Sequence, residues 1–166
     1  MIPSFYLSSN SLHILKHQID NQIKRSDTLY SIVSTAIVRG IESVEVLVEA
    51  DVSDGMPIFT MVGFLASEVK EASERVRTAL RNSGYMLPPK RITVNLSPAD
   101  VRKSGSGFDL PIAVAILAAL GIVEEEKLGR MFIAGEVGLN GDILPVEGVL
   151  PLVTAAKERG MQSCMI

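Results

Sequence analysis

The chain has 166 residues, of which 47% are hydrophobic and 21% are charged, and its formal net charge is −3. This length suits one domain with a single core, and the 5% aromatic content without tryptophan predicts that aliphatic side chains fill that core. The negative charge excludes a bulk attraction to nucleic acid or acidic membranes, so any such contact would need a local basic patch.

Cysteine usage and hydropathy indicate the compartment. The single cysteine, Cys164, excludes an internal disulfide and a cysteine metal cluster, and suits a reducing environment. The longest apolar run, about 110–123, is shorter than the roughly 18 residues of a membrane span and is typical of a core helix. The N-terminus lacks the pattern of an export signal. We therefore expect a cytoplasmic protein without membrane contact.

Residues 1–29 differ from the rest of the chain, and we expect a helical or disordered leader there. His13 and His17 are four residues apart and would share one helix face, as metal ligands can. No third ligand stands nearby in the sequence, so we expect no metal site. The domain proper is predicted to span residues 30–166.

Three strands are predicted at the start of this domain. A strand is predicted over 32–39, a turn follows at Gly40, and over 44–52 apolar residues at every second position alternate mostly with polar ones. A third strand is predicted over 58–62, after the turn at Asp54-Gly55. We expect these strands to form an antiparallel meander.

A helix is predicted from Ser67, as its N-cap, to about Asn82. Glu71 precedes Arg75 by four residues, which favours an ion pair on the exposed face. The acidic residues at helical spacing on this face, expected to be solvated, are Glu68, Glu71 and Glu74.

The central segment, 91–121, combines a half-buried strand over 91–96, a basic glycine-bearing loop and a helix that is apolar on all sides. Asp109 is the expected N-cap of this helix, with Pro111 in its first turn and Gly121 as its stop. An acidic linker over 124–126 follows.

The C-terminal part predicts a strand over 131–134, a hairpin that turns at Asn140-Gly141, a helix over about 149–159 and a strand that begins at Ser163. We expect the chain to be a piece of a longer protein.

The loop before the central helix is the candidate binding site. Arg102, Lys103, Ser104 and Gly105 place adjacent cations and free backbone N–H groups near a helix N-terminus, where phosphate, including that of nucleic acid, can bind. We expect both cations to be exposed. The pattern G-x-x-x-x-G-K-[ST] is absent, so we expect no ATP binding by this chain.

Several segments, in this order, resemble one family. They are YS (30–31), GF (63–64), SEVKEASERVR (67–77), VNLSPAD (94–100), KSG (103–105), DLPIA (109–113) and GEVGLNG (135–141). Together they resemble the N-terminal domain of the magnesium-chelatase-like AAA+ ATPases of the YifB and competence-protein ComM type.

The resemblance implies an α+β fold like domain 2 of ribosomal protein S5, a mixed, mostly antiparallel sheet packed on about three helices. The Lon peptidase domain shares this fold and uses a serine before the buried helix and a lysine on the helix after the second hairpin. The matching positions here are Gly107 and Leu150, so both members of the dyad are missing. Ser104 and Ser106 lie one to three residues away and have no obvious base.

Three functions remain open. The first is a non-catalytic accessory domain of a cytoplasmic ATPase, in which a downstream AAA+ module binds ATP and magnesium and a hexameric, helicase-type motor acts on DNA. The second is a Lon-like serine peptidase with a displaced dyad. The third is a free-standing module that binds nucleic acid.

Overall fold

The computed structural model of the chain describes residues 28–40 and 42–166. His13, His17 and the predicted leader lie outside the described residues, except for positions 28 and 29, which begin the first strand. Within the described part, no three His, Cys, Asp or Glu residues group as metal ligands would. No helix in that part combines the length and hydropathy that crossing a membrane requires.

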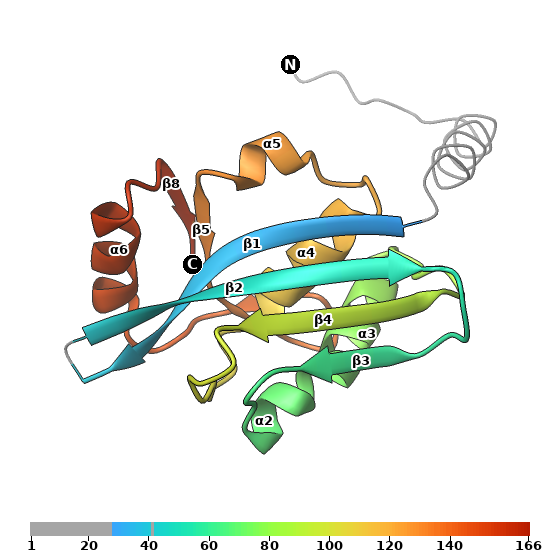
Figure 1. Cartoon of the computed structure of the whole chain (residues 1–166), viewed down its shortest axis with the longest axis horizontal. Coiled ribbons are helices and arrows are strands. Elements are labelled where there is room, and N and C mark those ends of the chain that lie inside the picture. Colours follow the sequence, from blue (N-terminus) through green and yellow to red (C-terminus); the bar gives the residue numbers. More distant parts are fainter. Residues whose placement is uncertain (1–27, 41) are drawn as a thin grey trace, which may run out of the picture.

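The elements keep the labels of Figure 1. The strands are β1 (Thr28–Arg39), β2 (Glu42–Ser53), β3 (Phe59–Val62), β4 (Arg91–Ser97), β5 (Met131–Ile133), β6 (Glu136–Val137), β7 (Ile143–Leu144) and β8 (Ser163–Met165). The helices are α2 (Ser67–Lys70), α3 (Ala72–Asn82), α4 (Asp109–Ala119), α5 (Glu125–Leu128) and α6 (Val149–Glu158).

The main sheet has the strand order β3-β4-β2-β1-β5-β8. Its two longest pairings, β1 with β2 and β2 with β4, are antiparallel, whereas the shorter outer pairings are parallel. Helices α3 and α4 lie together behind the central strands in Figure 1 and form the second layer. The predicted α+β architecture, with a mixed sheet packed on helices, is confirmed.

The core lies between this sheet and α4. Alternate residues of β2 and β4 face it, so that Val46, Val48 and Val94 are fully buried while their neighbours are half-exposed. Helix α4 is buried on nearly every side, and Ile112 and Ile116 have no exposed surface. The period-two and all-apolar patterns of the sequence therefore predicted both layers correctly.

A second, smaller core lies where α6 packs beside β1 and β5. Phe132, Ala134 and Leu152 are buried there with Ala36 of β1. The predicted helix over 149–159 and the strand from Ser163 are confirmed as α6 and β8. This arrangement places the start of α6 beside the last residues of β1.

The predicted antiparallel meander is wrong in its third strand. β3 does not pair with β2; β4 lies between them, and β3 runs parallel to β4. Helices α2 and α3 connect β3 to β4, and a helical crossover is the connection that parallel strands require. Alternation along a strand predicts its faces but carries no information about its neighbours.

Two further local predictions need correction. The helix expected over 67–82 is divided at Glu71, and Ala66, rather than Ser67, holds its N-cap position. The Ala66 N–H donates to the Lys103 carbonyl at 2.9 Å, so a contact distant in sequence sets this start. The acidic linker contains a short helix, α5, whose Leu128 is buried.

The hairpin formed by β6 and β7 turns at Asn140-Gly141, as predicted. It packs against the end of α3, where the Asn82 Nδ2 donates to the Leu139 carbonyl at 2.6 Å. Gly141 has φ +92°, and a Cβ there would lie 2.1 Å from the Ser83 Oγ. This glycine therefore allows both the turn and its close approach to α3.

We predict that Gly141→Ala lowers the free energy of unfolding by about 1 to 2 kcal/mol, because alanine resists the left-handed conformation. Gly129→Ala is the matched control, since nothing lies within 4 Å of its Cβ position and its φ is −60°. We expect the control to change stability by less than about 0.5 kcal/mol. Urea unfolding of both variants tests the prediction, which fails if they behave alike.

Candidate functional site

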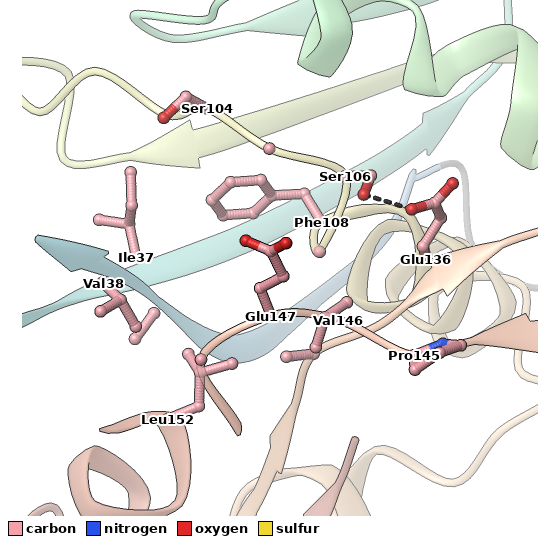
Figure 2. A pocket seen from close by; sticks show the side chains of 15 residues that line it. Ile37, Val38, Ser104, Ser106, Phe108, Glu136, Pro145, Val146, Glu147 and Leu152 are labelled. Atoms are coloured by element: carbon pink, nitrogen blue, oxygen red, sulfur yellow. Dashed lines mark hydrogen bonds between the residues drawn. The ribbon is translucent and has the colours of Figure 1, made fainter. Parts of the chain in front are cut away.

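A cleft of about 640 Å³ opens between the loop before α4, the segment before α6 and the end of β1. Figure 2 shows Phe108, Val146, Leu152 and Ile37 among the side chains that line it. These four side chains give the cleft an apolar floor. Because Phe108 and Leu152 are almost completely buried, the floor is part of the folded core.

The polar side chains of the cleft are two serines and two glutamates. Ser106 and Glu136 are joined by a hydrogen bond, in which the hydroxyl donates to the carboxylate. Glu147 extends from the segment before α6 towards Phe108. Ser104 is an exposed residue of the lining. The sequence prediction missed Glu136 and Glu147; the only signal for Glu136 was its place in the GEVGLNG segment.

The positions that a Lon-type dyad would occupy carry no nucleophile and no base. Gly107 lines the cleft without a side chain, and Leu150 is 78% exposed and does not line it. None of the residues that line the cleft is Lys, Arg or His. Ser106 therefore has a carboxylate as its partner, and no cationic or imidazole base from this lining reaches it.

The four residues of the predicted phosphate site are not presented together. Arg102 is exposed, and its carbonyl accepts a hydrogen bond from Arg39 Nη2 at 3.4 Å. Ser104 and Gly105 are also exposed. The Gly105 N–H, which was expected to be free for an anion, donates to the Glu68 Oε1 at 3.3 Å.

The prediction that both loop cations are exposed is wrong for Lys103, which has no exposed surface. Its backbone N–H donates to the Phe64 carbonyl at 2.9 Å, and its ammonium donates to the Pro98 carbonyl. Burial lowers the pKa of this lysine, and the charge of Asp100 opposes the shift. Backbone pairing beside Leu65 draws the side chain inward, which its polar sequence neighbours do not indicate.

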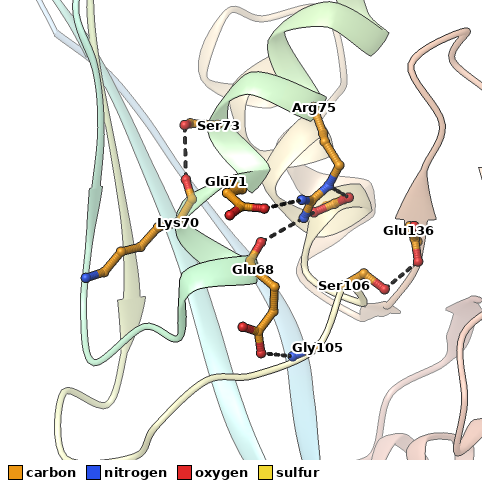
Figure 3. A network of polar contacts seen from close by, with 9 residues as sticks. Glu68, Lys70, Glu71, Ser73, Arg75, Gly105, Ser106 and Glu136 are labelled. Atoms are coloured by element: carbon orange, nitrogen blue, oxygen red, sulfur yellow. Dashed lines mark hydrogen bonds and ion pairs between the residues drawn. The ribbon is translucent and has the colours of Figure 1, made fainter.

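The loop ends at an ion pair that joins α3 to α4 (Figure 3). Arg75 donates from Nε to Asp109 Oδ2 at 2.8 Å and from Nη2 to Asp109 Oδ1 at 2.9 Å. Its Nη2 also reaches the Glu68 carbonyl at 2.9 Å, whereas the predicted pair with Glu71 is longer, at 3.9 Å. Arg75 is thus bound mainly to Asp109 and not to the exposed face of its own helix.

The prediction that Asp109 is the N-cap of the buried helix is also wrong. Phe108 holds the N-cap position of α4, and Asp109 is the first helical residue, with its side chain fully buried. Burial raises the pKa of the Asp109 carboxyl, although the hydrogen bonds and charge of Arg75 oppose the rise. A capping aspartate and an ion-paired aspartate look identical in sequence, since the partner lies 34 residues away.

Backbone hydrogen bonds hold the same loop from the side of β5. The Gly135 N–H donates to the Gly107 carbonyl at 3.0 Å, and the Leu110 N–H donates to the Gly135 carbonyl at 2.9 Å. A Cβ at Gly135 would lie 2.8 Å from Leu110 Cδ2, so the close approach needs glycine. The wall of the cleft is therefore fixed before any ligand arrives.

We predict that Arg75→Ala lowers the free energy of unfolding by about 3 kcal/mol, because it leaves the buried Asp109 carboxylate without its partner. Arg81→Ala, an exposed arginine on the same helix, should cost less than about 0.5 kcal/mol. Chemical denaturation of both variants measures the difference.

The double variant Arg75→Ala/Asp109→Ala separates the pair from other effects of truncation. If the ion pair stabilises the fold, the double variant loses less free energy of unfolding than the two single variants lose together. Equal losses for Arg75→Ala and Arg81→Ala would show that the ion pair contributes nothing.

Comparison with known proteins connects this geometry to a family. A family model described as subunit ChlI of Mg-chelatase matches residues 48–166. Over 130 residues the chain is 44% identical to YifB, an uncharacterized protein of Escherichia coli (strain K12), covering 78% of this chain and 26% of YifB. Over 128 residues it is 43% identical to the competence protein ComM of Haemophilus influenzae, covering 77% of this chain and 25% of ComM.

A weaker match reaches Lon protease 2 of Bacillus subtilis, with 30% identity over 100 residues that cover 60% of this chain and 18% of the protease. The chain spans about a quarter of the length of YifB and ComM. The family model covers most of the described domain, including all segments that line the cleft except the end of β1. The chain therefore belongs to the Mg-chelatase subunit ChlI family, with YifB and ComM among its relatives.

Proposed function

We propose that this chain is a non-catalytic accessory domain of a magnesium-chelatase-like ATPase. The observation that carries the proposal is the cleft itself. Its lining includes Gly107, which the resemblance to Lon places at the serine of the dyad, and contains no Lys, Arg or His; Leu150, at the lysine position, lies outside the lining. A cleft that lacks the serine and the lysine of the Lon dyad, and in which the partner of Ser106 is a carboxylate, is suited to binding rather than to acyl transfer.

The larger setting is also a proposal. The relatives YifB and ComM are about four times as long as their match to this chain. We propose that an AAA+ module elsewhere in such a polypeptide binds ATP and magnesium, that the protein assembles as a hexamer in the cytoplasm, and that the motor acts on DNA. The choice of DNA rests on one relative, ComM, which is named a competence protein.

We predict no labelling of Ser104 or Ser106 by a fluorophosphonate probe, because neither hydroxyl has an amine or imidazole base among the residues that line the cleft. Trypsin under the same conditions is the positive control, and intact-mass spectrometry is the measurement. Labelling of the wild-type chain that disappears in Ser106→Ala would favour the displaced-dyad peptidase and overturn the non-catalytic proposal.

Nucleic-acid contact, if the domain contributes to it, centres on Arg102, because Lys103 is buried and Arg102 lies beside the exposed Arg39. We predict that Arg102→Ala flattens the log–log salt dependence of binding to a labelled DNA duplex by about 0.9, the value of one phosphate contact. Arg81→Ala is the matched control, and fluorescence anisotropy is the measurement. Identical binding by wild type and Arg102→Ala at every salt concentration would exclude the loop from DNA contact.

A further inference from the structure

The last residues of β1 form a strand edge beside the cleft that has no strand partner among the described residues, although Ala36 and Ile37 there are each only 7% exposed. β1 pairs with β2 along its whole length on one side, but on the other side it pairs with β5 only at Ser34. Beyond this point, Ala36, Ile37 and Val38 line the cleft. Within the described part of the chain, no strand pairs with this edge of β1 after Ser34. Unpaired backbone groups of a strand edge can accept another extended chain.

The floor beside this edge can accommodate side chains. Phe108, Val146 and Leu152 form an apolar surface, and the volume of about 640 Å³ falls in the range of sites that bind small ligands. An extended chain is narrow and advances about 3.3 Å per residue. A cleft with the volume of a small-ligand site can therefore hold a few residues of such a chain, whereas a folded domain is too large for it. The shape therefore favours a short extended peptide.

The charge of the cleft indicates what such a peptide carries. Glu136 and Glu147 are the charged residues of the lining, and they face no lysine, arginine or histidine within it. The Ser106 hydroxyl donates to Oε2 of Glu136, and outside the lining the charge of Glu136 also helps to raise the pKa of Arg75. Glu147 is exposed and forms no ion pair with any residue that the structure describes. Two carboxylates above an apolar floor are complementary to a cationic side chain on an extended backbone.

We propose that this cleft binds an extended segment of a partner polypeptide, which adds as a strand to the edge of β1 and places a lysine or arginine between Glu136 and Glu147. The edge without a strand partner gives affinity through the peptide backbone, and the two carboxylates give selectivity through the side chain. The segment is bound and released uncleaved, and in this respect alone the proposal rests on the proposed non-catalytic function.

The test uses fluorescein-labelled peptides with the core Val-Arg-Val and fluorescence anisotropy against the 166-residue chain. We expect saturable binding of this peptide and at least about tenfold weaker binding of a Val-Glu-Val peptide, because the glutamate would face two carboxylates. A version with N-methylated valines cannot donate backbone hydrogen bonds and should also bind about tenfold more weakly. Equal binding of the arginine and glutamate peptides, or of the N-methylated version, would overturn the proposal.

Glu147→Gln removes one negative charge from an exposed position. We expect this variant to bind the arginine peptide about threefold to tenfold more weakly than wild type does. Glu126→Gln on α5, which does not line the cleft, is the matched control and should bind like wild type. Equal circular dichroism of both variants shows that they are folded. Unchanged binding by Glu147→Gln would contradict the proposed role of the carboxylate.

Two further outcomes are distinguishable. Mass spectrometry of the peptide after incubation reports cleavage, which would overturn the non-catalytic function while leaving the peptide site intact. Sedimentation of the free chain reports self-association, and a dimer that Glu147→Gln dissociates would assign the cleft to a second copy and overturn the partner proposal. Absence of binding by every peptide overturns the partner proposal alone.

Discussion

The ion pair between Arg75 and Asp109 is the contact on which the cleft wall depends. It joins α3 to the first residue of α4, and the loop that lines the cleft ends at that residue. Asp109 is completely buried, so water cannot replace Arg75 as its partner. Arg75 contacts both carboxylate oxygens of Asp109 at once. This geometry requires a planar, bidentate donor, which arginine supplies and lysine does not. The ion pair between α3 and the first residue of α4 thus fixes the end of the loop.

Backbone hydrogen bonds hold the same loop elsewhere along its length. Lys103 pairs with Phe64 and Ala66, and Gly107 pairs with Gly135. Only the short stretch around Ser104 and Gly105 is left exposed between these attachments. A wall that is fixed in the free protein loses little conformational entropy on binding, which favours affinity for a ligand that fits.

The similarity to Lon concerns the fold, and the side chains of the cleft have to be considered separately. The cleft keeps an apolar floor and a strand edge, but glycine and an exposed leucine stand at the positions of the dyad. The charged groups that remain, Glu136 and Glu147, favour cationic ligands. Function has to be argued from these side chains, because the shared architecture is compatible with cleavage, with binding, and with neither.

The sequence by itself determined most strands and the buried helix α4, because these follow from apolar periodicity, and its resemblance to a known family supplied the fold class. It did not determine that β4 separates β2 from β3, that Lys103 is buried, or that Asp109 binds Arg75 instead of capping its helix. It also missed the two glutamates of the cleft. Each of these features joins residues far apart in the chain, and local pattern carries no information about which distant groups a fold brings together.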